Sequence, residues 1–485
     1  MDLINTQILL NLNYPDIINA CQALPAFSRV CETGYFWALK AERDFGISKL
    51  SLVPGNTNQE RYEFIYNVEG PNTGLMKAVE IGILQLVKYF FNQGTDLLVD
   101  QQALILAAKN GHFDIVKYLV EEGVDFHAND EEALRWAAMN GHLDVVKYLV
   151  EQGADLHVRD EEALVLAAKY GHLDVVKYLV EQRADLHTGN EWALRWAAGH
   201  GYLDIVKYLV ERGADLHAMD EYALREAAMN GHLNVVKYLV EQGADLHAGD
   251  EVALRWAAQF NHLDVVKYLV EQGADLHAHD EEALRWAAMN GHLDVVKYLI
   301  GQGANLHAKN EKALRWAAKN GHLDVVKYLV EQGANIEKAL KSAASEDQLN
   351  VVKYLVEQGV DIHADDERAL SLASRFGHLD VVKYLVEQGA NITKEALSSA
   401  TRYGHLDVVK YLVEQGANLH ELDEDALVWT IVYGNLDTIK YLIEQGLNLN
   451  EEALRSAGTQ GYFDDDIDDE IIEYFLERGV NLFEY

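Results

Sequence analysis

Residue types that enzymes use for acid–base and metal chemistry occur throughout this chain of 485 residues. The segment from Glu131 to His157 alone holds two neighbouring carboxylates, an arginine, a tryptophan and two histidines. Carboxylates and histidines can act as general acids and bases, and both can ligate zinc. These groups would indicate an enzyme if they were gathered in a single place.

They recur instead at a regular interval. An Ala-Leu pair returns every 30 residues from Ala103 to Ala313, and then at spacings of 26, 30, 27, 30 and 27 as far as Ala453. A tyrosine also recurs once in each unit, and its fourteen occurrences indicate fourteen units from about residue 74 to the end of the chain. We therefore interpret pairs such as Glu131-Glu132 as solvated helix starts rather than as catalytic dyads, because a general acid or base needs one defined pocket.

The histidines fall into two sets of equivalent positions, which we call ladders. In one ladder the histidine usually follows a glycine (Gly-His), and in the other it usually ends the tripeptide Asp-Leu-His. Equivalent residues of stacked helices lie about 10 Å apart, whereas zinc ligands must lie about 2 Å from one metal ion. We expect no catalytic, cofactor-binding or metal-binding site. The segment from Asp464 to Glu470 does not match a calcium loop either, since Asp469 and Phe475 stand where glycine and glutamate are needed.

Each unit is predicted to form two helices. In the first, Ala133, Leu134, Ala137 and Ala138 share one face, and Asp130 is a suitable N-cap. The second helix carries the apolar stripe Val145, Val146, Leu149 and Val150, and a glycine ends it in the left-handed conformation. Such a helix pair buries its apolar stripes only by stacking on its neighbours.

The segment "NGHLDVVKYLVEQGADLHA" resembles the ankyrin repeat, and the resemblance covers about 410 residues. It implies an all-α ankyrin-repeat solenoid of about 14 repeats, in which the Gly-His histidine hydrogen-bonds to nearby loop backbone. Two departures are evident: Glu-Ala-Leu-Arg replaces the usual Thr-Pro-Leu-His, and the units are shorter than usual. We therefore expect shortened, blunt loops, most of all from Ala339 onward.

Charge and cysteine content limit the environment and the partners. The net charge is −37, of which residues 1–73 contribute only −3, so the repeats are strongly acidic. Such a surface disfavours nucleic acid and favours proteins with basic surfaces. Two cysteines in so long a chain make no disulfide framework, and no stretch is apolar enough to span a membrane. We expect a cytoplasmic monomer without a membrane segment.

Residues 1–48 do not repeat, and residues 49–73 are predicted to be a linker before an array over 74–485. The first segment resembles an F-box, a small helical domain that docks on a Skp1-like adaptor of a cullin ubiquitin ligase. The resemblance assigns adaptor binding to eight positions: Ile8, Leu12, Pro15, Ile17, Ile18, Phe27, Val30 and Trp37. An alternative is a helical cap that seals the first repeat.

An F-box-like head before a long acidic array resembles the ankyrin-repeat proteins of mimivirus-type giant viruses. That resemblance implies a substrate-recruiting adaptor of a host SCF-type ubiquitin ligase, acting in the host cytoplasm and binding its client on the array. The alternative is an ankyrin scaffold or host-factor-sequestering protein with no link to ubiquitin. Neither interpretation predicts an enzyme.

The copies differ from one another at a few places on the loop and on the open side of the first helix. Between residues 189 and 260 the usual glutamate before the Ala-Leu pair gives way to apolar and aromatic residues. Such anchors within a polar rim are typical of protein-binding hot spots. We therefore predict a partner-binding surface that comprises Trp192, His200, Met219, Tyr222, Val252 and Phe260.

The recurrent tryptophan, as in Trp136, is expected to pack half-buried between repeats. Arg183 replaces the glycine that ends the second helix in other units. A left-handed arginine there should cost about 1 kcal/mol.

Overall fold

The computed structural model describes residues 2–47, 55, 57–68, 70–422, 429–430, 435–447, 470, 473–474 and 477. These residues form helices, turns and loops with no β strand, so the expected all-α class with blunt loops is confirmed. Contacts divide the chain into two compact units, residues 1–227 with 234–245, and residues 228–233 with 246–485. The Ala-Leu pairs at Ala426 and Ala453, and nearly all of Asp464–Glu470, lie outside the described residues.

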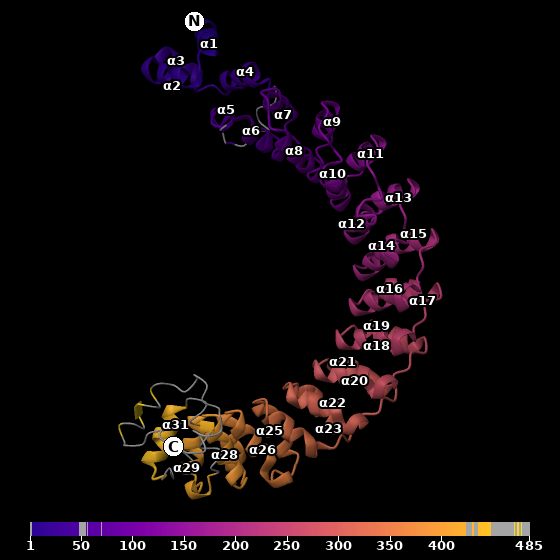
Figure 1. Cartoon of the computed structure of the whole chain (residues 1–485), viewed down its shortest axis with the longest axis vertical. Coiled ribbons are helices and arrows are strands. Elements are labelled where there is room, and N and C mark those ends of the chain that lie inside the picture. Colours follow the sequence, from indigo (N-terminus) through magenta and orange to yellow (C-terminus); the bar gives the residue numbers. More distant parts are fainter. Residues whose placement is uncertain are drawn as a thin grey trace. The chain divides into compact units, whose positions relative to one another are not determined.

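The first unit contains an N-terminal group of helices followed by the first repeats (Figure 1). The N-terminal helices are α1 (Asp2–Leu10), α2 (Tyr14–Ala23), α3 (Pro25–Cys31), α4 (Gly34–Phe45) and α5 (Asn58–Tyr66). The repeats follow as α6 (Gly70–Glu80), α7 (Leu84–Phe91), α8 (Leu97–Lys109), α9 (Phe113–Glu121), α10 (Ala128–Met139), α11 (Leu143–Glu151), α12 (Glu162–Lys169), α13 (Leu173–Glu181), α14 (Thr188–Gly199) and α15 (Leu203–Glu211). The chain passes between the units within α16 (Ala218–Met229) and α17 (Leu233–Glu241).

The second unit continues the same helix pairs. Its helices are α18 (Ala248–Gln259), α19 (Leu263–Glu271), α20 (Ala278–Met289), α21 (Leu293–Gly301), α22 (Ala308–Lys319), α23 (Leu323–Glu331), α24 (Ala339–Ala344), α25 (Leu349–Glu357), α26 (Ala364–Arg375), α27 (Leu379–Glu387), α28 (Lys394–Arg402), α29 (Leu406–Glu414) and α31 (Leu436–Glu444). Two short 3₁₀ helices are η2 (Ile336–Lys338), which precedes the shortened repeat of α24, and η3 (Leu419–Glu421).

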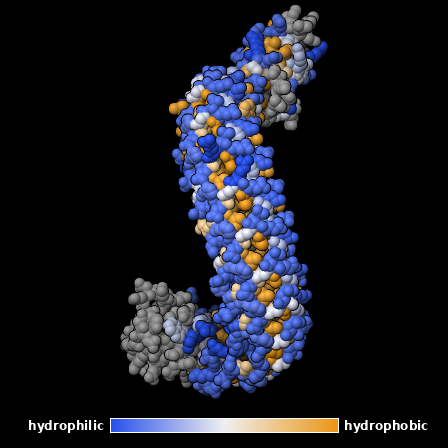
Figure 2. Space-filling model, turned by 90° about the vertical axis from the view of Figure 1, so that its right-hand side faces the viewer, coloured by the Kyte–Doolittle hydropathy of each residue, from blue (hydrophilic) through white to orange (hydrophobic). Residues whose placement is uncertain are grey.

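The core of each repeat is formed by the apolar stripes that the sequence predicted. In α10, Ala133, Leu134, Ala137 and Ala138 are at most 1% exposed. Their small side chains let α10 pack against the first helices on either side, α8 and α12, as well as on its own partner α11. In Figure 2 the visible face of the repeats is mainly hydrophilic, and its apolar residues form a narrow row rather than a broad patch. The large exposed aromatic side chains of the described repeats are Tyr170, Trp192, Trp196, Phe260, Phe376 and Tyr403.

The start of each full-length first helix differs from the prediction. Asn129, Asp130 and Glu131 all lie in the left-handed region, with φ of 54°, 58° and 56°, so the predicted N-cap role of Asp130 is wrong. The same three places are left-handed in other full-length repeats, for example Met219, Asp220 and Glu221. This left-handed turn carries the glutamate inward, and Glu131 is only 3% exposed. The prediction of a solvated Glu131 is therefore also wrong.

Shortened repeats omit this left-handed turn. Before α24, the Asn335 side chain accepts a hydrogen bond from the Glu337 N–H and begins η2 directly. Before α28, the Thr393 hydroxyl accepts a hydrogen bond from the Ala396 N–H as a conventional N-cap. The deleted residues thus come from the segment that otherwise supplies the buried glutamate.

The N-terminal helices share an aromatic core. Trp37 and Tyr62 are each 1% exposed, and their ring centroids lie 5.3 Å apart. Tyr62 belongs to α5, a helix that lies within residues 49–73, the predicted linker. Phe45 contacts Tyr62 at 5.2 Å and Tyr89 of α7 at 5.3 Å. The N-terminal helices therefore pack directly on the first repeat.

Candidate functional site

A groove in the first unit crosses the first helices α12, α14 and α16. It has a volume of about 390 Å³. Its lining combines apolar, aromatic and charged side chains: Arg159, Glu162, Val165, Leu166, Lys169, Trp192, Arg195, Trp196, Tyr222 and Glu226. Trp192 and Trp196 are each 39% exposed. Aromatic anchors with a polar rim are the usual composition of a protein-binding hot spot.

Two cations hold the aromatic rings of the groove in place. The Arg195 guanidinium lies 4.0 Å from the centre of the Tyr222 ring, and the Lys169 ammonium lies 4.1 Å from that of Trp196. Each contact joins neighbouring repeats, because the cation and the ring belong to successive first helices. Cation–π contacts of this kind contribute about 0.5–2 kcal/mol. The groove therefore presents rings whose positions are fixed before any partner arrives.

The structure brings four of the six predicted partner-binding residues to this region. Trp192 and Tyr222 line the groove, and the Met219 sulfur accepts a hydrogen bond from the Arg195 guanidinium at 3.1 Å. The His200 ring lies 5.5 Å from that of Trp196. Val252, half-buried, and Phe260, 43% exposed, belong to the second unit.

Comparison of the repeats missed Lys169, Arg195 and Trp196. Arg195 and Trp196 match Arg135 and Trp136 of another repeat and so did not stand out, whereas Lys169 stands at a place that varies, as Met139 and Gly199 show. What such a residue contributes to the groove depends on the side chain that it contacts in the neighbouring repeat. Arg135 Nη1 bonds to Glu162 Oε2 at 2.8 Å, whereas the equivalent Arg195 faces Tyr222. A variable place therefore changes the role of an invariant neighbour.

The buried glutamates form pairs with histidines. His187 Nδ1 lies 2.6 Å from Glu191 Oε1, and the same pair occurs in eight repeats, from His127–Glu131 to His363–Glu367. The hydrogen bond to the Glu191 carboxylate raises the pKa of His187 above its ordinary value. Glu131 Oε1 also accepts the Asp155 N–H of the next repeat at 3.1 Å. These pairs fasten one loop to the next, which is a structural role.

Seven of the Gly-His histidines bond to backbone, as expected, whereas the Nε2 atom of His112 makes no hydrogen bond to any described residue. His142 Nε2 donates to the Lys109 carbonyl of the preceding repeat at 3.0 Å, and His292 does the same to Gln259 at 2.8 Å. Burial lowers the pKa of His292 because desolvation disfavours the imidazolium. These histidines thus join successive repeats, whereas those of the Asp-Leu-His places bond to a glutamate of their own loop.

The recurrent tryptophans are half-buried, as expected, except Trp196, which is 39% exposed. The side chains of Trp136, Trp256, Trp286, Trp316 and Trp429 are half-buried. The Lys109 ammonium covers the Trp136 ring at 4.3 Å.

The eight positions in residues 1–48 that were predicted to bind an adaptor lie partly in the core of the N-terminal helices and partly on their surface. Ile17, Val30 and Trp37 are at most 4% exposed, and Trp37 Nε1 donates to the Cys31 carbonyl at 2.7 Å. Leu12, Ile18 and Phe27 are half-buried, whereas Ile8 and Pro15 are exposed. Leu24, which the sequence did not single out, is 50% exposed. The buried three stabilise the head, so any direct contact with a partner must use the others.

Cys21 of α2 and Cys31 of α3 form a disulfide, with Cα atoms 6.3 Å apart. The sequence predicted no disulfide framework, and this single bond joins two helices of the N-terminal group. Within the described part of the chain, no three His, Cys, Asp or Glu side chains are grouped closely enough to hold a metal ion. None of the helices there is long and apolar enough to cross a membrane.

Comparison with known proteins identifies the repeats. The family described as "Ankyrin repeats (3 copies)" matches residues 75–160, 159–220, 217–280, 276–339, 335–396, 370–453 and 397–482. Among solved structures, the crystal structure of the human ASB11 ankyrin repeat domain is similar at 24% sequence identity. Its TM-score is 0.37, and the match covers 41% of this chain and 99% of that one. No curated protein matches the chain.

Proposed function

We propose that this chain, which belongs to the ankyrin-repeat family, binds a client protein in the groove across α12, α14 and α16. Ankyrin repeats are protein–protein interaction modules. The observation that supports this location is that two exposed tryptophans, Trp192 and Trp196, line one groove. Val165 and Leu166 extend the apolar surface between them. The groove suits an apolar or aromatic side chain of the client, with charged groups around it.

A peptide library displayed on phage and panned on the full-length chain tests this location. We expect the enriched peptides to carry an apolar or aromatic residue. Their affinity, measured by fluorescence anisotropy, should fall several-fold when Trp192 and Tyr222 are both replaced by alanine. Met289→Ala is the matched control, because Met289 is also 39% exposed and lies outside the groove. Equal affinity for the wild type and the double variant would place the client elsewhere.

We further propose that the N-terminal helices recruit a Skp1-like adaptor, so that the chain presents its client to an SCF-type ubiquitin ligase of a host cell. The proposal is supported by the exposed apolar side chains of Ile8 and Leu24, at 46% and 50%. Because Phe45 and Tyr89 join the head to α7, a client on the array would be linked to the ligase without a long tether.

The second candidate is a scaffold or sequestering protein whose head only caps the array. The same contact of Phe45 with Tyr89 supports it, since terminal repeats of solenoids need a cover for their apolar face. The two candidates differ in what the surface of the head does, because only the adaptor needs Ile8 and Leu24.

Binding of a purified Skp1-like adaptor to the full-length chain separates the two candidates. The adaptor hypothesis predicts a complex with the wild type that is lost in Ile8→Asp/Leu24→Asp. It also predicts that the complex is kept in Leu97→Asp/Leu98→Asp, a control with two exposed leucines of α8. Absence of a complex with the wild type would favour the cap.

A further inference from the structure

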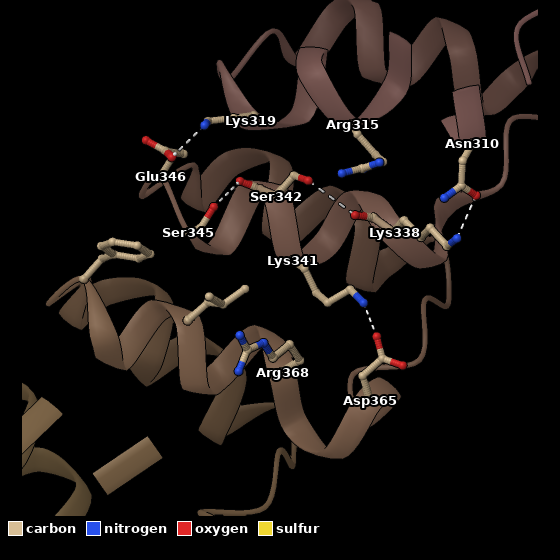
Figure 3. A pocket seen from close by; sticks show the side chains of 12 residues that line it. Asn310, Arg315, Lys319, Lys338, Lys341, Ser342, Ser345, Glu346, Asp365 and Arg368 are labelled. Carbon is tan, nitrogen blue, oxygen red and sulfur yellow. Dashed lines mark hydrogen bonds and ion pairs between the residues drawn. The ribbon is translucent and has the colours of Figure 1, made fainter. Parts of the chain in front are cut away.

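A second cavity lies wholly in the second unit and has the opposite charge to the chain. It has a volume of about 820 Å³ and spans the first helices α22, α24 and α26. Figure 3 shows its charged residues converging from these three helices and their loops. Its lining contains two carboxylates and five cations: Arg315, Lys319, Lys338, Lys341 and Arg368. A net positive pocket is unexpected on a chain whose net charge is −37.

A lysine at the place before the Ala-Leu pair contributes to this charge. In the register of the Ala-Leu pairs, Arg135 bonds to Glu162, the residue before Ala163, and Arg255 bonds to Glu282 in the same way. The residue before Ala339 is Lys338. Arg315, the counterpart of Arg135, therefore shares the pocket with an ammonium group and lacks the carboxylate that Arg135 and Arg255 bond to.

Three of the five cations form no ion pair among the described residues, although Lys338 and Arg368 lie near enough to Asp365 to help Lys341 lower the pKa of that carboxyl. Lys341 pairs with Asp365, and Lys319 pairs with Glu346 at 3.3 Å. The Lys338 ammonium reaches only the neutral Asn310 side-chain oxygen, at 2.7 Å. In the described part of the chain, Arg315 and Arg368 make no hydrogen bond or ion pair. An anion of suitable shape would find three cations on three successive repeats.

An apolar surface borders these cations. Leu372 and Phe376 of α26 complete the lining, and Phe376 is 47% exposed. Guanidinium groups bind carboxylates with two parallel hydrogen bonds, and an exposed phenyl ring accepts an apolar side chain. The pocket therefore offers both elements that recognise an acidic peptide with an apolar residue.

We propose that this basic pocket binds a carboxylate-rich segment of a partner protein, with an apolar side chain of that segment against Phe376. A nucleic acid suits the site less well, because the acidic repeats around it repel an extended polyanion. This inference rests on the protein-binding function proposed above and adds a second site, which binds an acidic segment rather than an apolar one. The groove at Trp192 and this pocket lie in different units, so either can fail without the other.

The test uses the full-length chain and a short fluorescent peptide of glutamates around one phenylalanine. We expect binding that weakens as salt rises and that is lost for the same peptide with glutamine in place of glutamate. Lys338→Glu restores the residue type that pairs with Arg135 and Arg255, so it should fold normally and weaken peptide binding by about tenfold or more. Arg315→Gln/Arg368→Gln should weaken binding similarly.

Matched controls keep the result specific. Lys353→Gln/Lys394→Gln removes two positive charges from exposed lysines of the same unit outside the pocket and should bind the peptide as the wild type does. Trp192→Ala/Tyr222→Ala should also bind it normally. The proposal is overturned if the wild type does not bind the peptide, if the lysine controls lose binding equally, or if a single-stranded oligonucleotide binds the pocket more tightly than the peptide.

Discussion

Replacing Gly111 by alanine should destabilise the array more than the same change at Gly123, although both glycines are left-handed. Gly111 has a φ of 71° and Gly123 a φ of 89°. A Cβ at Gly111 would lie 2.5 Å from Nδ1 and 2.6 Å from Cε1 of His142, whereas a Cβ at Gly123 would meet nothing within 4 Å. The comparison isolates the contact between one repeat and the histidine of the next.

The two costs can be separated. A left-handed alanine costs about 1–2 kcal/mol at either place. At Gly111 the imidazole must also move, which breaks the 3.0 Å hydrogen bond from His142 Nε2 to the Lys109 carbonyl. The loss of such a bond, with its acceptor left unsatisfied, costs about 1–3 kcal/mol. Gly111→Ala should therefore cost about 2–5 kcal/mol in total.

Hydrogen exchange of the full-length chain, read by mass spectrometry on peptides from α8 to α11, measures the local free energy of opening. It suits a long array, whose unfolding need not be two-state. We expect faster exchange at the junction of α8 with α10 and α11 in Gly111→Ala than in Gly123→Ala. In a His142→Ala background, which lacks the ring, Gly111→Ala should cost no more than Gly123→Ala. Equal exchange in the two single variants, or an undiminished difference without the ring, would refute the reasoning.

Other predictions concern single positions of the array. Arg183 has a φ of 72°, so Arg183→Gly should raise the stability of its repeat by about 1 kcal/mol, and a lowered urea midpoint would contradict this. Glu131→Ala should cost about 1–3 kcal/mol because the Asp155 N–H loses its acceptor, whereas the half-buried Glu132→Ala should cost less. The bond to Glu191 raises the pKa of His187, so the stability from this pair is fully present below the ordinary histidine pKa of about 6.5 and is lost as pH rises through the raised value. Urea midpoints between about pH 6 and pH 8 should fall less in Glu191→Gln than in the wild type, and an unchanged slope would argue against the pair.

Much of the fold could be predicted because each repeat contains its own local signals. The stripe of Ala133, Leu134, Ala137 and Ala138 specifies a helix face by spacing alone, and the structure buries it. The left-handed turn at Asn129, Asp130 and Glu131 could not be predicted in this way, since local preference made Asp130 an N-cap. The bonds of Glu131 to His127 and to the Asp155 N–H accompany this turn, and the second of them exists only once the next repeat is stacked.

The candidate sites show the same division. The sequence by itself determined the repeat, its acidic charge and the odd positions Trp192 and Tyr222, because copies within one chain can be compared place by place. Only the tertiary structure decided what these positions meet: Arg195 against Tyr222 in one unit, and Arg315 in a pocket with a lysine in the other. The physical reason is that a side chain on a first helix contacts residues about 27 positions away, on the neighbouring repeat. Whether a residue is paired or available for a partner therefore depends on its neighbour, which its own repeat does not encode.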